Sequence, residues 1–132
     1  MIALDTHAWI WLINEPDRLG AAARNAVKRH RRSRDAFLIS SISTWEIYML
    51  AAKKRLVMAM APEIWISRCE QLSFLRFCPV DTIIARISVT ACTGLHGDPA
   101  DRFIVATALQ HGASLITCDK KIHRSGLVKC IW

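Results

Sequence analysis

Residues 1–14 read MIALDTHAWIWLIN and contain the first structural signal of the chain. The apolar run from Ile2 to Leu4 is typical of a short buried strand, and it ends at Asp5. A helix-like segment follows at once, from Thr6 to Asn14, and stops near Pro16. A strand that passes directly into a helix begins a parallel βαβ unit, so these residues predict an α/β fold.

The rest of the chain repeats this alternation. The expected helices cover residues 19–32, 43–55, 62–72, 81–92 and 98–111, and the expected strands cover 37–40, 75–80, 114–118 and 127–130. Ser43 with Glu46 fits a capping box, and Asp81 and Asp98 fit N-caps. We predict one domain over residues 1–132, a three-layer α/β/α sandwich with a central, mostly parallel sheet.

Composition excludes several classes of protein. The 132 residues are 52% hydrophobic and 22% charged, which is enough for a core and unlike a disordered chain. No apolar run approaches the ~20 residues of a membrane helix, and the N-terminus makes a poor secretory signal. Five cysteines without a C-x-x-C pair argue against a disulfide framework or a zinc ribbon and favour the cytoplasm. The net charge of +7 indicates a polyanionic partner.

Acidic residues fall where the expected strands end or the expected helices begin. Five of the eleven do so: Asp5, Glu46, Asp98, Asp101 and Asp119. Sites in open α/β sheets form at the carboxyl ends of the strands, so these side chains can converge on one edge. Two carboxylates about 4 Å apart repel by on the order of 4 kcal/mol at intermediate dielectric, and a divalent cation removes that conflict. Carboxylate oxygens suit Mg²⁺ or Mn²⁺.

Each acid also has a simpler explanation. Carboxylates at helix starts satisfy free N–H groups, so Glu46 could serve only the capping box and Asp98 only as an N-cap. Asp5 and Asp119 could cap the helices that follow them. They are harder to explain in this way, because each directly follows a buried apolar run where an unpaired charge is costly.

Four segments of the chain resemble the PIN-domain nucleases, most closely the VapC-type toxins of bacterial toxin–antitoxin pairs. The segments are LDTHAWIWL (4–12), SISTWEI (41–47), HGDPADRFIVATA (96–108) and LITCDKKI (115–122), in the family's order and along nearly the whole chain. Two departures are small: residues 53–56 lack a glycine often present there, and Cys118 stands where a smaller residue is common.

The resemblance implies a function and a set of site residues. The chain would be a Mg²⁺- or Mn²⁺-dependent endoribonuclease, the toxin of a type II toxin–antitoxin pair. The resemblance implies an acidic quartet that binds metal and is catalytic, Asp5, Glu46, Asp101 and Asp119, with Asp98, Thr6 and Thr117 as auxiliary residues. Its implied partners are an RNA substrate, a cognate VapB-type antitoxin and a second copy of the chain, with no membrane.

Two other functions compete with this interpretation. A non-catalytic RNA- or partner-binding module with a PIN-like fold would use the pocket only for capture, but a degenerate site would lack acids that are all present here. A metal-dependent phosphatase is disfavoured, because Asp5-Thr6-His7 lacks the second aspartate of a D-x-D loop.

Basic residues are candidates for RNA contact. They are Lys28, Arg29, Arg31 and Arg32 in the densest basic run, together with Arg102 and Lys120 beside the expected acids. A solvated helix end is the alternative for the run, and a structural pairing with a neighbouring carboxylate is the alternative for Arg102. His7 and His96 are interpreted as polar packing residues, and the tryptophans as core or interface residues.

Overall fold

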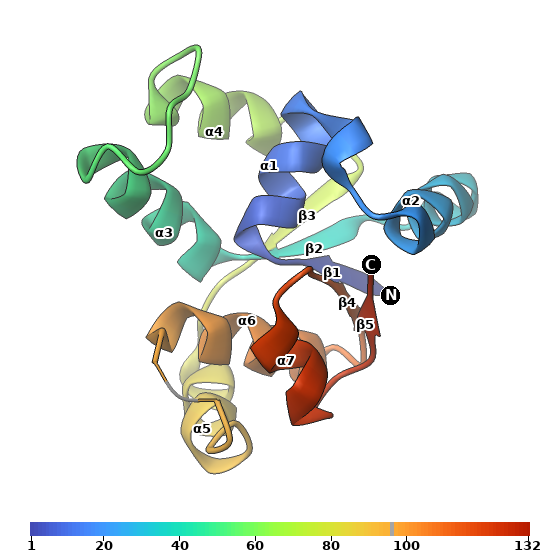
Figure 1. Cartoon of the computed structure of the whole chain (residues 1–132), viewed down its shortest axis with the longest axis vertical. Coiled ribbons are helices and arrows are strands. Elements are labelled where there is room, and N and C mark those ends of the chain that lie inside the picture. Colours follow the sequence, from blue (N-terminus) through green and yellow to red (C-terminus); the bar gives the residue numbers. More distant parts are fainter. Residues whose placement is uncertain (96) are drawn as a thin grey trace.

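Five strands form one sheet at the centre of the molecule (Figure 1). The structure is a computed structural model that describes residues 1–95 and 97–132, so His96 lies outside the described residues. The strand order is β3-β2-β1-β4-β5, and each pairing is parallel. The strands are β1 (Ile2–Leu4), β2 (Phe37–Ser40), β3 (Leu75–Cys78), β4 (Ser114–Ile116) and β5 (Cys130–Ile131).

Helices cover both faces of this sheet (Figure 1). One face carries α1 (Thr6–Asn14), the 3₁₀ turn η1 (Pro16–Arg18), α2 (Ala21–Ser33), α3 (Ser41–Ala52) and α4 (Pro62–Glu70). The other face carries α5 (Thr82–Thr90), α6 (Pro99–Gln110) and α7 (Lys120–Ser125). The predicted α/β/α sandwich is confirmed. Within the described residues, no helix is long and apolar enough to cross a membrane.

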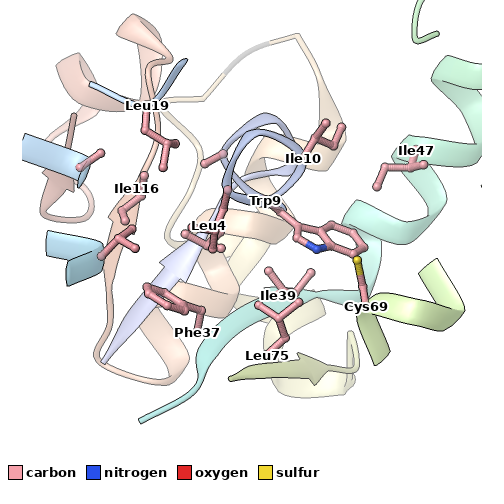
Figure 2. Close-up of a cluster of buried hydrophobic side chains, with 14 of the residues drawn as sticks. Leu4, Trp9, Ile10, Leu19, Phe37, Ile39, Ile47, Cys69, Leu75 and Ile116 are labelled. Carbon is pink, nitrogen blue, oxygen red and sulfur yellow. The ribbon is translucent and has the colours of Figure 1, made fainter. Parts of the chain in front are cut away.

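Two hydrophobic cores lie on the two faces of the sheet. Side chains alternate along a strand, so each central strand contributes to both cores. On β2, Phe37 and Ile39 pack into the core around the fully buried Trp9 (Figure 2), whereas Leu38 packs with Ile104 of α6 in the other core. Both layers of helices therefore depend on the same few strands.

Several predicted boundaries differ from the structure. The strands β3, β4 and β5 are shorter than or shifted from the expected 75–80, 114–118 and 127–130, and most helix ends move by one to three residues. The predicted capping box of Ser43 and Glu46 is wrong. Helix α3 begins two residues earlier, at Ser41, and Ser40 is its N-cap with its Oγ accepting from the Ile42 N–H at 3.4 Å.

Candidate active site

A cavity of about 200 Å³ opens at the carboxyl edge of the sheet, and five carboxylates line it. Asp5 follows β1, Glu46 lies on the helix after β2, Asp98 and Asp101 begin α6, and Asp119 follows β4. The other lining residues are Thr6, His7, Ile104 and Cys118. The fold thus brings together all four acids of the predicted quartet and two of the auxiliary residues, Asp98 and Thr6.

Helix capping fixes the orientation of three of these acids. The Asp5 carboxylate accepts from the Ala8 N–H at 2.7 Å, and the Asp98 carboxylate accepts from the Ala100 N–H at 2.9 Å. Asp119 Oδ1 accepts from the N–H groups of Lys121 and Ile122 at 2.7 and 3.1 Å. The simpler explanation from the sequence is therefore correct for these three acids. It does not exclude a second role, because capping uses only part of the acceptor capacity of a carboxylate.

Glu46 has no capping role. Helix α3 begins at Ser41, so Glu46 lies beyond its first turn and points toward the cavity from the middle of the helix. The buried Thr6 hydroxyl donates to the Ser43 hydroxyl at 2.9 Å, which joins α1 to α3 one turn before Glu46. The Thr6 side chain also lies close enough to the Glu46 carboxylate to lower its pKa, against the larger effect of burial. The sequence did not reveal Ser43 as a support for the site.

Thr117 supports the site without lining the cavity. Its buried hydroxyl accepts from the Asp119 N–H at 3.0 Å and hydrogen-bonds to the Asp5 carboxylate. One side chain therefore connects the acid after β1 with the acid after β4. The auxiliary role in catalysis that the sequence resemblance implied for Thr117 stays a prediction.

The carboxylates raise one another's affinity for protons. Burial, and then the negative charges of the neighbouring acids, raise the pKa of Asp101 to about 7. Burial is also the main cause that raises the pKa of Asp5 and of Glu46. In the part of the chain that the structure describes, none of the five acids forms an ion pair with a lysine, arginine or histidine. No direct ion pair with a basic side chain of the described residues therefore neutralises these carboxylates.

The side chains present suit a hard divalent cation. The donors facing the cavity are carboxylate oxygens, which Mg²⁺ and Mn²⁺ prefer, and their mutual repulsion is the conflict that such an ion relieves. Among the described residues, no three acidic, histidine or cysteine side chains already converge as a closed metal site.

The structure places the residues predicted to contact RNA in different parts of the molecule. Arg31, on the last turn of α2, lies over the Phe74 ring at 4.7 Å, next to the amino ends of β2 and β3 and opposite the acidic edge. The Arg102 Nε–H donates to the Leu95 carbonyl at 2.6 Å, so Arg102 has a structural contact, but with a backbone carbonyl and not with the expected carboxylate. Lys120 is exposed directly after Asp119.

His7 packs against Trp11, as expected, and also lines the acidic cavity. Its ring is exposed, lines the acidic cavity and lies 5.6 Å from the Trp11 ring. Its position two residues after Asp5, at the start of α1, was the signal that could have placed it at the site.

Three comparisons relate the chain to known proteins. The PIN domain profile matches residues 2–126. Ribonuclease VapC22 of Mycobacterium tuberculosis (strain ATCC 25618 / H37Rv) is 31% identical over 133 residues, which cover 99% of this chain and 98% of that protein. A DNA-bound VapBC from Salmonella typhimurium has a TM-score of 0.67 at 24% identity, covering 98% of this chain and 95% of that one. A toxin–antitoxin complex from Klebsiella pneumoniae has a TM-score of 0.64 at 25% identity, covering 97% and 95%.

Fold and site together define a three-layer α/β/α protein whose carboxylates gather at the carboxyl edge of a parallel sheet. The chain belongs to the PIN-domain family, and within that family it is a VapC-type toxin ribonuclease. The resemblance found in the four sequence segments is confirmed along the whole chain.

Proposed function

We propose that this chain hydrolyses RNA phosphodiester bonds with a divalent cation, Mg²⁺ or Mn²⁺, held by Asp5, Asp101 and Asp119. Glu46 contributes to the same site directly or through water. The observation that carries the proposal is the gathering of five carboxylates in one cavity, none of which forms an ion pair with a basic side chain among the described residues. Family membership supplies the class of reaction.

The chain's own residues hold and orient the reacting groups. When bound, Mg²⁺ or Mn²⁺ supplies positive charge that acidifies water and neutralises charge developing on the phosphate. The capped carboxylates of Asp5 and Asp119 keep fixed orientations, and Thr117 links them. Burial and the neighbouring acids raise the pKa of Asp101 to about 7, and a cation at the site would favour the ionised carboxylate that can bind it. Pre-set carboxylates reduce the reorganisation that the reaction requires.

The proposal extends to protein partners. The structural neighbours include a VapBC assembly and a toxin–antitoxin complex, which supports a cognate VapB-type antitoxin for this chain. Large apolar side chains are exposed on α3 and in the loop after it, at Trp45, Tyr48 and Val57, the last of which is 93% exposed. Apolar surface of this kind favours protein contact, either with the antitoxin or with a second copy in a homodimer. We further propose a cytoplasmic location.

The test is cleavage of total RNA by the purified protein in Mg²⁺ or Mn²⁺, with an EDTA control. Asp5→Asn and Asp101→Asn remove one negative charge each with little change of shape, and each should slow cleavage by roughly a hundredfold or more. Asp17→Asn is the matched control, since Asp17 is exposed on η1 and outside the cavity. Circular dichroism confirms the fold of each variant.

Undiminished cleavage by Asp5→Asn or Asp101→Asn would overturn the assignment of the site. A wild-type protein that binds RNA in Mg²⁺ but never cleaves it would favour the non-catalytic binding module instead.

A further inference from the structure

Two further hollows continue from the acidic cavity along the β5 edge of the sheet. Cys118 lines both the acidic cavity and a hollow of about 320 Å³, here called the Trp132 hollow, whose other lining residues are Lys120, His123, Arg124 and Trp132. His123 and Trp132 also line a third hollow of about 540 Å³, the α2 hollow, with Ala22, Asn25, Arg29, Lys129, Cys130 and Ile131. Because neighbouring hollows share lining residues, the acidic cavity, the Trp132 hollow and the α2 hollow follow one another along the surface.

Trp132 separates the two hollows and is held in place from several sides. Strand β5 pairs with β4, and the Thr117 N–H donates to the Ile131 carbonyl at 3.3 Å, which sets Trp132 beside the end of β4. The Trp11 ring lies 5.7 Å from the Trp132 ring, and a Cβ at Gly20 would come within 2.9 Å of the indole. The ring remains partly exposed. A fixed, partly exposed indole is suited to stacking against a nucleobase.

Positive side chains border both hollows. Lys120 and Arg124 are exposed four residues apart on α7, so they share one face of that helix. A hydrogen bond of 2.7 Å between His123 Nε2 and the Thr117 carbonyl ties α7 to the end of β4. Arg29 and Lys129 are exposed at the α2 hollow. Among the described residues, no aspartate or glutamate lines either hollow.

We propose that the Trp132 hollow and the α2 hollow bind single-stranded RNA on one side of the phosphodiester that is cut. One base stacks against Trp132, phosphates contact Lys120 and Arg124, and the strand continues toward Arg29 on α2. This inference rests on the proposed function and names its substrate-binding path. The occupant follows from charge complementarity and from continuity with the acidic cavity.

Only part of the basic run on α2 lies on the proposed RNA path. Ala22, Asn25 and Arg29 lie along one face of the helix and line the α2 hollow, whereas Arg31 packs on Phe74 away from it. Only the residues on the β5 side of α2 are therefore expected to contact RNA.

The experiment measures KM, kcat and salt dependence for cleavage of single-stranded RNA oligonucleotides in Mg²⁺. The variant carries Arg29→Glu and Arg124→Glu, one substitution in each hollow. Neither residue lines the acidic cavity. The matched control carries Arg68→Glu and Arg86→Glu, which make the same charge change on the exposed faces of α4 and α5. The hollow variant should raise KM at least about tenfold relative to the control, and its salt slope should be smaller by about 1.4, that is about 0.7 for each lost phosphate contact to a single strand.

Trp132→Leu and Trp132→Phe separate stacking from packing. Trp132→Leu should raise KM by roughly 5-fold or more, which corresponds to the lower end of the stacking free energy of one base. Trp132→Phe keeps an aromatic face and should therefore retain most of the wild-type affinity. Unfolding curves of both variants report any loss of stability, and equal KM changes for Leu and Phe would count against stacking.

The outcomes distinguish this path from the proposed function. If the wild type cleaves RNA and the hollow variant matches the control in KM and salt slope, the RNA path is wrong and the nuclease function stands. If the hollow variant instead loses only self-association or antitoxin binding, a protein occupies the hollows and the RNA path is again wrong. If the wild type does not cleave RNA, both proposals fail together.

Discussion

Asp101 is a residue whose negative charge costs the folded state free energy near neutral pH. Its pKa is raised from 3.8 to about 7, because burial and the surrounding acids disfavour the ionised form. The folded chain therefore holds a proton that the unfolded chain releases between about pH 4 and about pH 7. Stability from this group is fully present below about pH 4, decreases as the pH rises through that window, and is absent above it.

Asp101→Asn should reverse this cost in metal-free protein. At about pH 8 the variant should be more stable than the wild type by on the order of 1 to 2 kcal/mol, since solvent screening of a partly exposed group reduces the full effect. The difference should disappear at about pH 4. Urea unfolding in EDTA at both pH values measures it, and a wild type as stable as the variant at about pH 8 would show that neither burial nor the neighbouring acids penalise the Asp101 charge.

Protons and metal ions should compete for the same oxygens. Below the Asp101 pKa of about 7, a bound proton must leave before that carboxylate can serve as a ligand. The apparent affinity for Mn²⁺ should therefore weaken by up to about tenfold per pH unit between about pH 7 and about pH 5. Calorimetric titration with Mn²⁺ measures this directly, and an affinity independent of pH would exclude Asp101 as a ligand.

At the scale of elements, one pair of hydroxyls joins α1 to α3. The Thr6 and Ser43 hydroxyls are both buried and lie 2.9 Å apart. Thr6→Val or Ser43→Ala alone should each destabilise the fold by on the order of 1 to 2 kcal/mol, because the remaining hydroxyl loses its partner. The double variant should cost less than the sum of the two single variants. Strict additivity in urea unfolding would mean that the hydroxyls do not interact.

The junction between α2 and β5 depends on a glycine without a side chain. Gly20 has φ −60°, which alanine adopts easily, but an alanine Cβ would lie 2.6 Å from the Trp132 backbone carbon. Gly20→Ala should therefore displace Trp132 and destabilise the fold by on the order of 1 to 3 kcal/mol. Gly94→Ala is the control, since no described atom lies within 4 Å of its added Cβ. Similar thermal unfolding of the two variants would contradict this close contact.

At the scale of the whole molecule, local signals predicted the strand–helix alternation and most of the acidic site. Asp5 and Asp119 were found because each directly follows an apolar run of the sequence, a signal that depends on neighbouring residues alone. The role of Ser43 could not be predicted, since its partner Thr6 is 37 residues away and a capping box fits the same letters. The position of Trp132 beside Gly20 depends equally on the order of strands, which local sequence does not determine.

The two cores should unfold together, because both rest on the same strands. Leu38 packs on one face of the sheet between Phe37 and Ile39, which pack on the other, so neither layer of helices can leave without exposing the shared sheet. The tryptophans that pack in or against a core, such as Trp9 and Trp65, belong to the α1–α4 face, so their fluorescence reports that face alone. Hydrogen exchange of α6 amides reports the opposite face. We expect coincident transitions in urea and one free energy of unfolding, as for a single domain over residues 1–132. Protection lost from α6 at lower urea than the fluorescence change would instead show two independent units.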